Sequence, residues 1–134
     1  MLNPDHIKIY GLTLILCVLF NLSNNQLFAN IQDSSFLKKG IVKYNKGIFP
    51  SSLEDLNKAI HNEPHNFEAY YYRALVQFEL SNYESAIHDL NKTIELKPTY
   101  SMAFMKRGQI RAAQKDKKGA IEDYSQAITL DPNN

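Results

Sequence analysis

The sequence repeats itself with a period of 34 residues, and this periodicity restricts the fold more than any other feature. Moving residues 101–134 back by one period, and then by a second, brings the same residue types into register. Three of these columns are the prolines Pro64, Pro98 and Pro132, the aspartates Asp55, Asp89 and Asp123, and the small residues Ser52, Ala86 and Ala120. A period of this length through three units without insertion is typical of a helical repeat array.

Each unit contains the spacing of two helices. In the second unit, Tyr70, Ala74 and Phe78 recur every four residues and predict a helix from about Phe67 to Leu80. After a polar break at Ser81-Asn82, apolar residues from Tyr83 to Ile94 predict a second helix that ends before Pro98. The equivalent breaks are Lys46-Gly47 in the first unit and the region of Lys115-Asp116 in the third.

These columns resemble the tetratricopeptide repeat, whose pattern has an aromatic residue at position 4, small residues at 8 and 20, and proline at 32. The residues that carry the resemblance are Phe36, Gly40, Ser52 and Pro64, then Tyr70, Ala74, Ala86 and Pro98, then Phe104, Gly108, Ala120 and Pro132. The resemblance implies an all-α fold, a right-handed α-solenoid of three helix-turn-helix repeats at residues 33–66, 67–100 and 101–134. Neighbouring pairs stack because one pair cannot bury its apolar face alone.

A charge pattern also repeats. Lys39, Arg73 and Arg107 form one column, and an aspartate follows each of them by sixteen residues. The basic column is either a stripe for an acidic partner or one half of an ion pair between the two helices of each unit. The matching acidic column favours the ion pair, so these residues are assigned to structure, with about 0 to 1 kcal/mol for each pair if it is exposed.

In the family that the sequence resembles, the first helices line a concave groove that holds a peptide or a helix. The resemblance therefore implies a non-catalytic module that binds a protein or peptide, with a groove formed by Leu37, Ile41, Tyr44, Tyr71, Tyr72, Leu75, Phe78, Met102, Met105, Lys106 and Gln109. One subclass grips a peptide carboxylate with Lys, Asn, Asn, Lys and Arg. Those positions are Leu37, Ile41, Tyr72, Met102 and Lys106 in this chain, and Lys106 alone has suitable chemistry.

Composition argues against several other functions. Fifteen basic and fourteen acidic residues give a formal net charge of +1, so nucleic-acid binding is not predicted. A basic run from Lys106 to Lys118 is interpreted as a solvated face. No phosphate-binding loop, nucleophile motif or metal-ligand set is present, so we expect no enzyme activity, no cofactor and no metal.

The amino-terminal residues 1–29 predict a targeting segment. Residues 9–20 are almost wholly apolar, which is too short to span a bilayer comfortably and suits a signal peptide. Export to the periplasm or the outside of the cell is the favoured interpretation, and cleavage would remove Cys17, the single cysteine. The alternatives are an uncleaved membrane anchor, which would tether the protein to a membrane, and a buried helix.

The sequence ends at the last position of the third unit, without the polar helix that covers the final face of many solenoids. Tyr124, Ala127 and Ile128 are therefore expected to leave part of their face open. This pattern supports a second hypothesis, a structural repeat unit that self-associates through the open helix face or belongs to a longer array. Docking by another protein is the third explanation.

Overall fold

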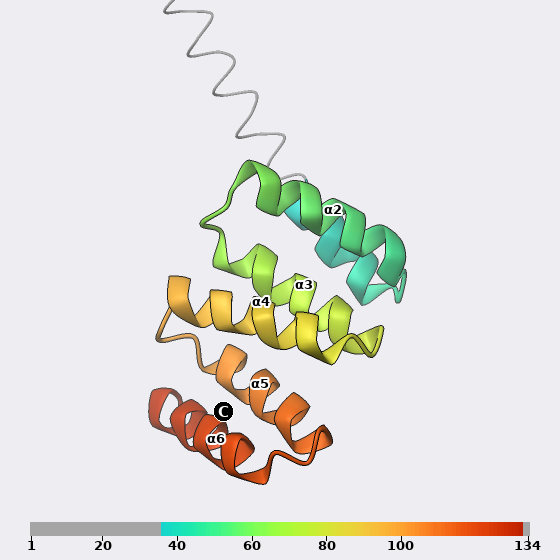
Figure 1. Cartoon of the computed structure of the whole chain (residues 1–134). Helices are drawn as coiled ribbons and strands as arrows, with labels where there is room; N and C mark the ends of the chain where they lie inside the picture. Colours follow the sequence, from blue (N-terminus) through green and yellow to red (C-terminus); the bar gives the residue numbers. More distant parts are fainter. Residues whose placement is uncertain (1–35, 133–134) are drawn as a thin grey trace, which may run out of the picture.

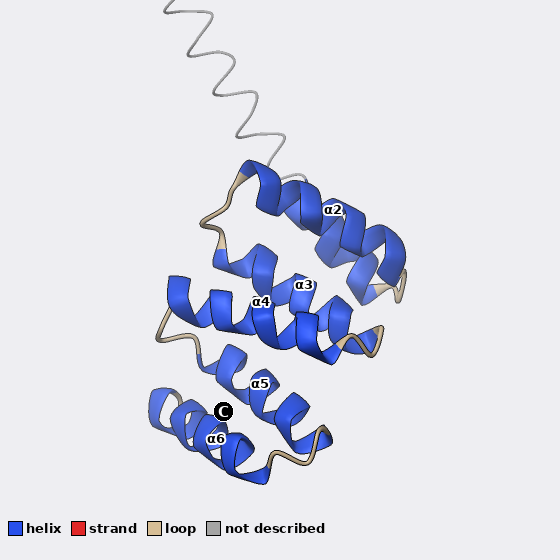
Figure 2. Ribbon diagram, viewed as in Figure 1, coloured by secondary structure: helices blue, strands red, loops and turns tan. Residues whose placement is uncertain are grey.

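Every secondary-structure element in the part of the chain that the structure describes, residues 36–132, is an α-helix (Figures 1 and 2). The computed structural model has a first helix over residues 36–45, followed by five further helices. These are α2 (Phe49–Asn62), α3 (Phe67–Glu79), α4 (Tyr83–Leu96), α5 (Ser101–Ala113) and α6 (Lys117–Leu130). The helices form three antiparallel pairs stacked in chain order, which confirms the predicted α-solenoid (Figure 1).

The turn inside each pair has the same backbone conformation. Gly47, Ser81 and Lys115 occupy one column of the repeat, and their φ angles are 72°, 61° and 66°. This left-handed conformation is readily accessible to glycine and costs energy for other residues. The first pair therefore has the residue that suits the turn, whereas the second and third pairs carry backbone strain at the same place.

Small residues let the two helices of a pair approach closely. Gly40 and Gly108 are buried, and a Cβ atom added to Gly108 would lie 2.8 Å from the Tyr124 ring. In the second pair the same column holds Ala74, which is fully buried. The opposing small column is buried as well, and Ser52 Oγ donates a hydrogen bond of 2.7 Å to the Gly40 carbonyl. The predicted close helix packing is confirmed.

The ion pairs predicted within each unit are present in the second and third pairs. Arg73 binds both carboxylate oxygens of Asp89 at 2.7 Å, and this hydrogen bonding raises the pKa of the Arg73 guanidinium. Arg107 binds Asp123 at 2.6 Å. The aspartate side chains are 3% exposed, so both pairs are largely buried and the value given for an exposed pair does not apply to them.

The first pair departs from the prediction. Asp55 pairs with Lys43, with 2.6 Å between Nζ and a carboxylate oxygen, rather than with Lys39. The Lys39 ammonium lies 5.4 Å from the centre of the Phe36 ring, as Arg73 and Arg107 lie 5.6 Å and 5.5 Å from the Tyr70 and Phe104 rings in their own pairs. A lysine has a single charged nitrogen and not the fork of an arginine. Lys43, one turn further along the helix than Lys39, forms the ion pair with Asp55 instead.

Within residues 36–132, no helix has the length and apolar character needed to cross a membrane. The predicted signal or anchor segment, including residues 9–20 and Cys17, lies outside the described residues.

Candidate protein-interaction surface

Successive first helices are joined by side chains that were predicted to line the groove. The Tyr44 ring of the first helix lies 6.1 Å from the Tyr72 ring of α3. Further along α3, the Phe78 ring lies 5.5 Å from the Lys106 ammonium of α5. We call the surface made by the helix over residues 36–45, α3 and α5 the first-helix surface. The structure therefore places these four predicted residues on it as two contacts that cross helix boundaries.

The predicted residues differ in how much surface they expose. Seven are half-buried, namely Leu37, Ile41, Tyr44, Tyr72, Phe78, Met105 and Lys106. Met102 is 37% exposed, and Gln109 is also exposed. Tyr71 and Leu75 are only 4% and 7% exposed and belong to the hydrophobic core. The half-buried group can contact a ligand, whereas Tyr71 and Leu75 act mainly as packing residues beneath it.

The burial of Tyr71 has a clear cause in an aromatic residue outside the helices. Tyr100, in the loop between α4 and α5, places its ring 5.1 Å from Tyr71 at an interplanar angle of 87°. The Tyr72 ring lies 5.6 Å from the Tyr71 ring, and the Phe67 ring lies 5.2 Å from the Tyr100 ring. The contacts form a continuous row of aromatic rings that connects the first helix pair with the start of the third.

Burial makes several of these tyrosines difficult to ionise. It is the main cause that raises the pKa of Tyr71, Tyr44 and Tyr100. The carboxylate of Glu79 raises the pKa of Tyr44 further, and that of Glu68 contributes at Tyr100. These three tyrosines are therefore uncharged at neutral pH, and the acidic side chains near them are Glu79 and Glu68.

Sequence periodicity missed Tyr100 and Tyr83 as members of this region. Tyr83 lies 5.8 Å from the Phe78 ring, at the start of α4. A helical pattern identifies residues that share a helix face, but Tyr100 lies in a loop and has no such pattern. Its position two residues after Pro98 is the available sequence signal, because this proline recurs in every unit.

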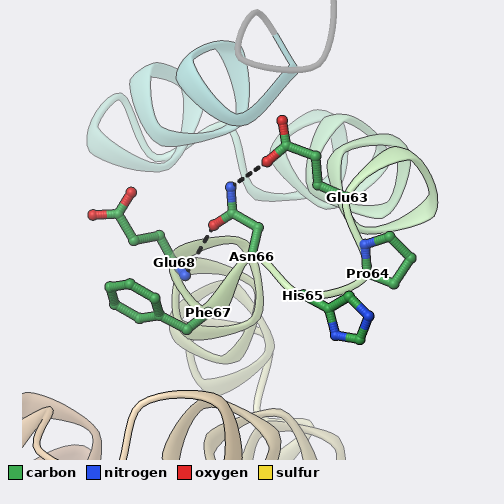
Figure 3. Close-up of a pocket in the computed structure, with 6 residues that line it drawn as sticks. All are labelled: Glu63, Pro64, His65, Asn66, Phe67 and Glu68. Atoms are coloured by element: carbon green, nitrogen blue, oxygen red, sulfur yellow. Dashed lines mark hydrogen bonds between the residues drawn. The ribbon is translucent and has the colours of Figure 1, made fainter. Parts of the chain in front are cut away.

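A shallow pocket of 530 Å³ lies elsewhere, along the loop between α2 and α3 (Figure 3). Its lining is residues 63–68, and the Asn66 side chain in this lining caps the start of α3. The Asn66 side chain accepts hydrogen bonds from the Glu68 and Ala69 amides and donates one of 2.7 Å to Glu63. This pocket is therefore explained by helix capping.

Among residues 36–132, no group of three or more His, Cys, Asp or Glu side chains is placed to hold a metal ion. His61 and His65, which have helical spacing in the sequence, are exposed; His61 lies in the last turn of α2 and His65 lies in the loop that follows. No metal-binding geometry therefore emerges from the described histidines.

Comparison with known proteins identifies the family. Tetratricopeptide repeat models match residues 67–100 and 101–134, which together make up half of the chain. The chain belongs to the tetratricopeptide repeat family. No curated protein sequence matches it significantly. The helical repeats of this family are typically interaction modules and not catalysts.

Solved structures agree with this assignment. The first tetratricopeptide domain of Spaghetti (RPAP3), solved with the HSP90 peptide SRMEEVD, has a TM-score of 0.74 and 26% identity over 76% of this chain and 81% of that one. The TPR2B domain of yeast Sti1, solved as a complex with Hsp70, has a TM-score of 0.73 and 25% identity over 75% and 81%. MamA has a TM-score of 0.72 and 27% identity over 75% and 58%. Similar domains thus bind peptides.

Proposed function

We propose that this protein is a non-catalytic interaction module that holds a peptide or a short helix of a partner protein on the first-helix surface. The observation that carries the proposal is the pair of contacts across helix boundaries, Tyr44 with Tyr72 and Phe78 with Lys106. All four side chains are half-buried, so each is packed against a neighbour and still has surface accessible to a ligand. Aromatic side chains of this kind are frequent binding hot spots.

The chemistry of the surface defines the ligand in outline. Apolar and aromatic residues such as Ile41, Tyr72 and Met105 occupy most of it, and Lys106 supplies a cation beside Phe78. Four of the five positions that grip a peptide carboxylate in the related subclass hold residues without suitable chemistry. We therefore infer that recognition is mainly apolar. The HSP90 peptide SRMEEVD seen with Spaghetti (RPAP3) should not bind measurably.

The test selects ligands from a random peptide library displayed on phage, using the full chain, and measures the selected peptides by fluorescence anisotropy. Tyr72→Ala should weaken binding roughly 30-fold, which corresponds to about 2 kcal/mol for a hot spot. The matched control is Tyr70→Ala, two residues away on the same helix. The Tyr70 hydroxyl bonds to the Pro64 carbonyl at 3.2 Å, on the side of the preceding helix.

Circular dichroism checks that both variants keep their helical content. Equal loss of affinity for the two variants, or none for Tyr72→Ala, would disprove the placement of the ligand. The burial of Tyr71 and Leu75 makes them unsuitable for the same test, because polar residues there would destabilise the core. Export, with an uncleaved anchor as the alternative, remains our proposal for localisation and depends on residues outside the described range.

A further inference from the structure

The two ends of the described solenoid expose the residue columns that are buried between helix pairs inside it. At one end, Val42 of the first helix is 50% exposed, whereas its equivalents Val76 and Ile110 are fully buried. At the other end, Ile121 and Ile128 of α6 are 65% and 62% exposed. Their equivalents in α4, Ile87 and Ile94, pack against the hydrophobic core. The ends therefore present the two halves of a junction that the molecule already forms twice internally.

The internal junctions also have a polar contact at a fixed register. Arg73 donates 2.8 Å to Asn57 of α2, and Arg107 donates 2.6 Å to Asn91 of α4. The same columns at the two ends hold Lys39 and Ser125. An ammonium group donates readily to a serine hydroxyl, as Lys43 does to Ser51 at 2.7 Å in the first pair. The end residues differ from the internal ones but keep a donor facing an acceptor.

We infer that the tail surface (Lys118, Ile121, Ser125 and Ile128 of α6) binds the head surface (Phe36, Lys39 and Val42 of the first helix) of a second copy of this chain. A second copy is the partner that fits, because inside the molecule α3 packs on α2, and α5 packs on α4, through the equivalent residues of the repeat. The contact is heterologous, so one copy offers its head while the other offers its tail, and further copies can add to a growing array. This interaction leaves the first-helix surface accessible and is independent of the proposed peptide binding.

One contact in this arrangement is unfavourable and makes the register testable. Inside the molecule, Gln114 donates to Glu84 at 3.3 Å across the junction between α5 and α4. In the head-to-tail contact these columns hold Lys46 and Lys118, two like charges. Lys118→Glu should therefore strengthen self-association several-fold, and Ser125→Asn should strengthen it too, since it restores the internal acceptor.

The experiment measures self-association of the full chain by sedimentation velocity. We expect the wild type to associate as its concentration rises, and the tail variant Ile121→Glu/Ile128→Glu to associate at least a hundredfold more weakly. The head variant Val42→Glu should weaken association at least tenfold. These side chains are exposed, so circular dichroism should show native helicity for both variants.

Mixing the two variants distinguishes the heterologous contact from every alternative. The tail variant retains a normal head and the head variant retains a normal tail, so a mixture should form a one-to-one dimer that neither forms alone. A mixture that stays monomeric overturns the inference. Loss of association in the tail variant alone also overturns it, and points to symmetric contact through α6. A monomeric wild type at millimolar concentration, or variants as associated as the wild type, also overturns it.

Discussion

The second and third helix pairs both contain a buried aspartate at the same register, but they neutralise it differently. Asp89 of the second pair is held by one arginine, Arg73, through two hydrogen bonds of 2.7 Å. Asp123 of the third pair is held by Arg107 and also by Arg111, whose Nη1 lies 3.0 Å from the carboxylate. The comparison shows that two repeats can bind the aspartate with the same arginine and yet differ in how much stability they lose when that arginine is removed. The third pair has a second arginine beside its aspartate, whereas among the described residues the second pair has only His88, 3.5 Å from Asp89.

The largest effect should follow from removing the single arginine of the second pair. Arg73→Ala leaves Asp89 buried with only His88 Nδ1 near it among the described side chains, at 3.5 Å. We expect the free energy of unfolding to fall by about 3 kcal/mol, because an uncompensated buried charge is costly. Urea denaturation measures this change. The matched control is Lys39→Ala in the same column, expected to cost less than about 0.5 kcal/mol since its ammonium does not neutralise an aspartate.

A difference in one core column should make the second pair sensitive to alkaline pH. Tyr71 stands where the third pair has Met105, and burial raises the pKa of Tyr71 well above its ordinary value. The unfolded chain therefore loses this proton first, near pH 10, so the free energy of unfolding falls as pH rises above that value, by up to about 1.4 kcal/mol per pH unit for each such tyrosine.

Tyr71→Phe should remove its share of this fall between about pH 10 and pH 11, as measured by urea denaturation at a series of pH values. Tyr70→Phe is the control, because the Tyr70 hydroxyl is exposed at its bond to Pro64. Parallel curves for wild type and Tyr71→Phe would show that another group causes the alkaline loss.

Removing the principal arginine of the third pair should cost less than the same change in the second. In Arg107→Ala, Arg111 still lies 3.0 Å from Asp123 and compensates its charge. We expect a loss of about 1 kcal/mol, which reflects the hydrogen bonds to Asp123 and Asn91. The double variant Arg107→Ala/Arg111→Ala should then lose at least as much as Arg73→Ala. Equal losses for the two single variants would refute the reserve role of Arg111.

The smallest effect concerns the strained turns. Lys115 has a φ angle of 66°, at the position where the first pair has Gly47. Lys115→Gly should raise the thermal unfolding midpoint, with a gain of about 0.5 to 1 kcal/mol, because glycine adopts this conformation without a steric cost. The reverse change, Gly47→Lys, should lower stability by a similar amount. A fall in stability for Lys115→Gly would mean that its side chain contributes more than the strain costs.

The sequence predicted the parts of the molecule that depend on periodicity. The breaks at Lys46-Gly47 and Ser81-Asn82 lie between the helices, and α3 ends within one residue of the predicted Leu80. The partner of Asp55 was predicted incorrectly, because Lys43 on the next turn of the same helix takes the place of Lys39, and column spacing does not reveal this exchange. The burial of Tyr71 depends on a loop residue, Tyr100, whose approach no helical pattern reveals. Which residues on the first-helix surface bind a ligand stays a prediction.

The arginine contacts have a consequence for how the sequence can change by insertion and deletion. Arg73 bonds to residues sixteen positions ahead and sixteen positions behind it, Asp89 and Asn57, and Arg107 has the same two spacings. A single residue gained or lost in either flanking turn would displace one partner from its arginine. Length changes in these turns are therefore opposed by chemistry as well as by helix packing. Drift of the 34-residue period should be tolerated best in the turn inside the first helix pair, where Asp55 pairs with Lys43 and not with Lys39, the residue in the arginine column.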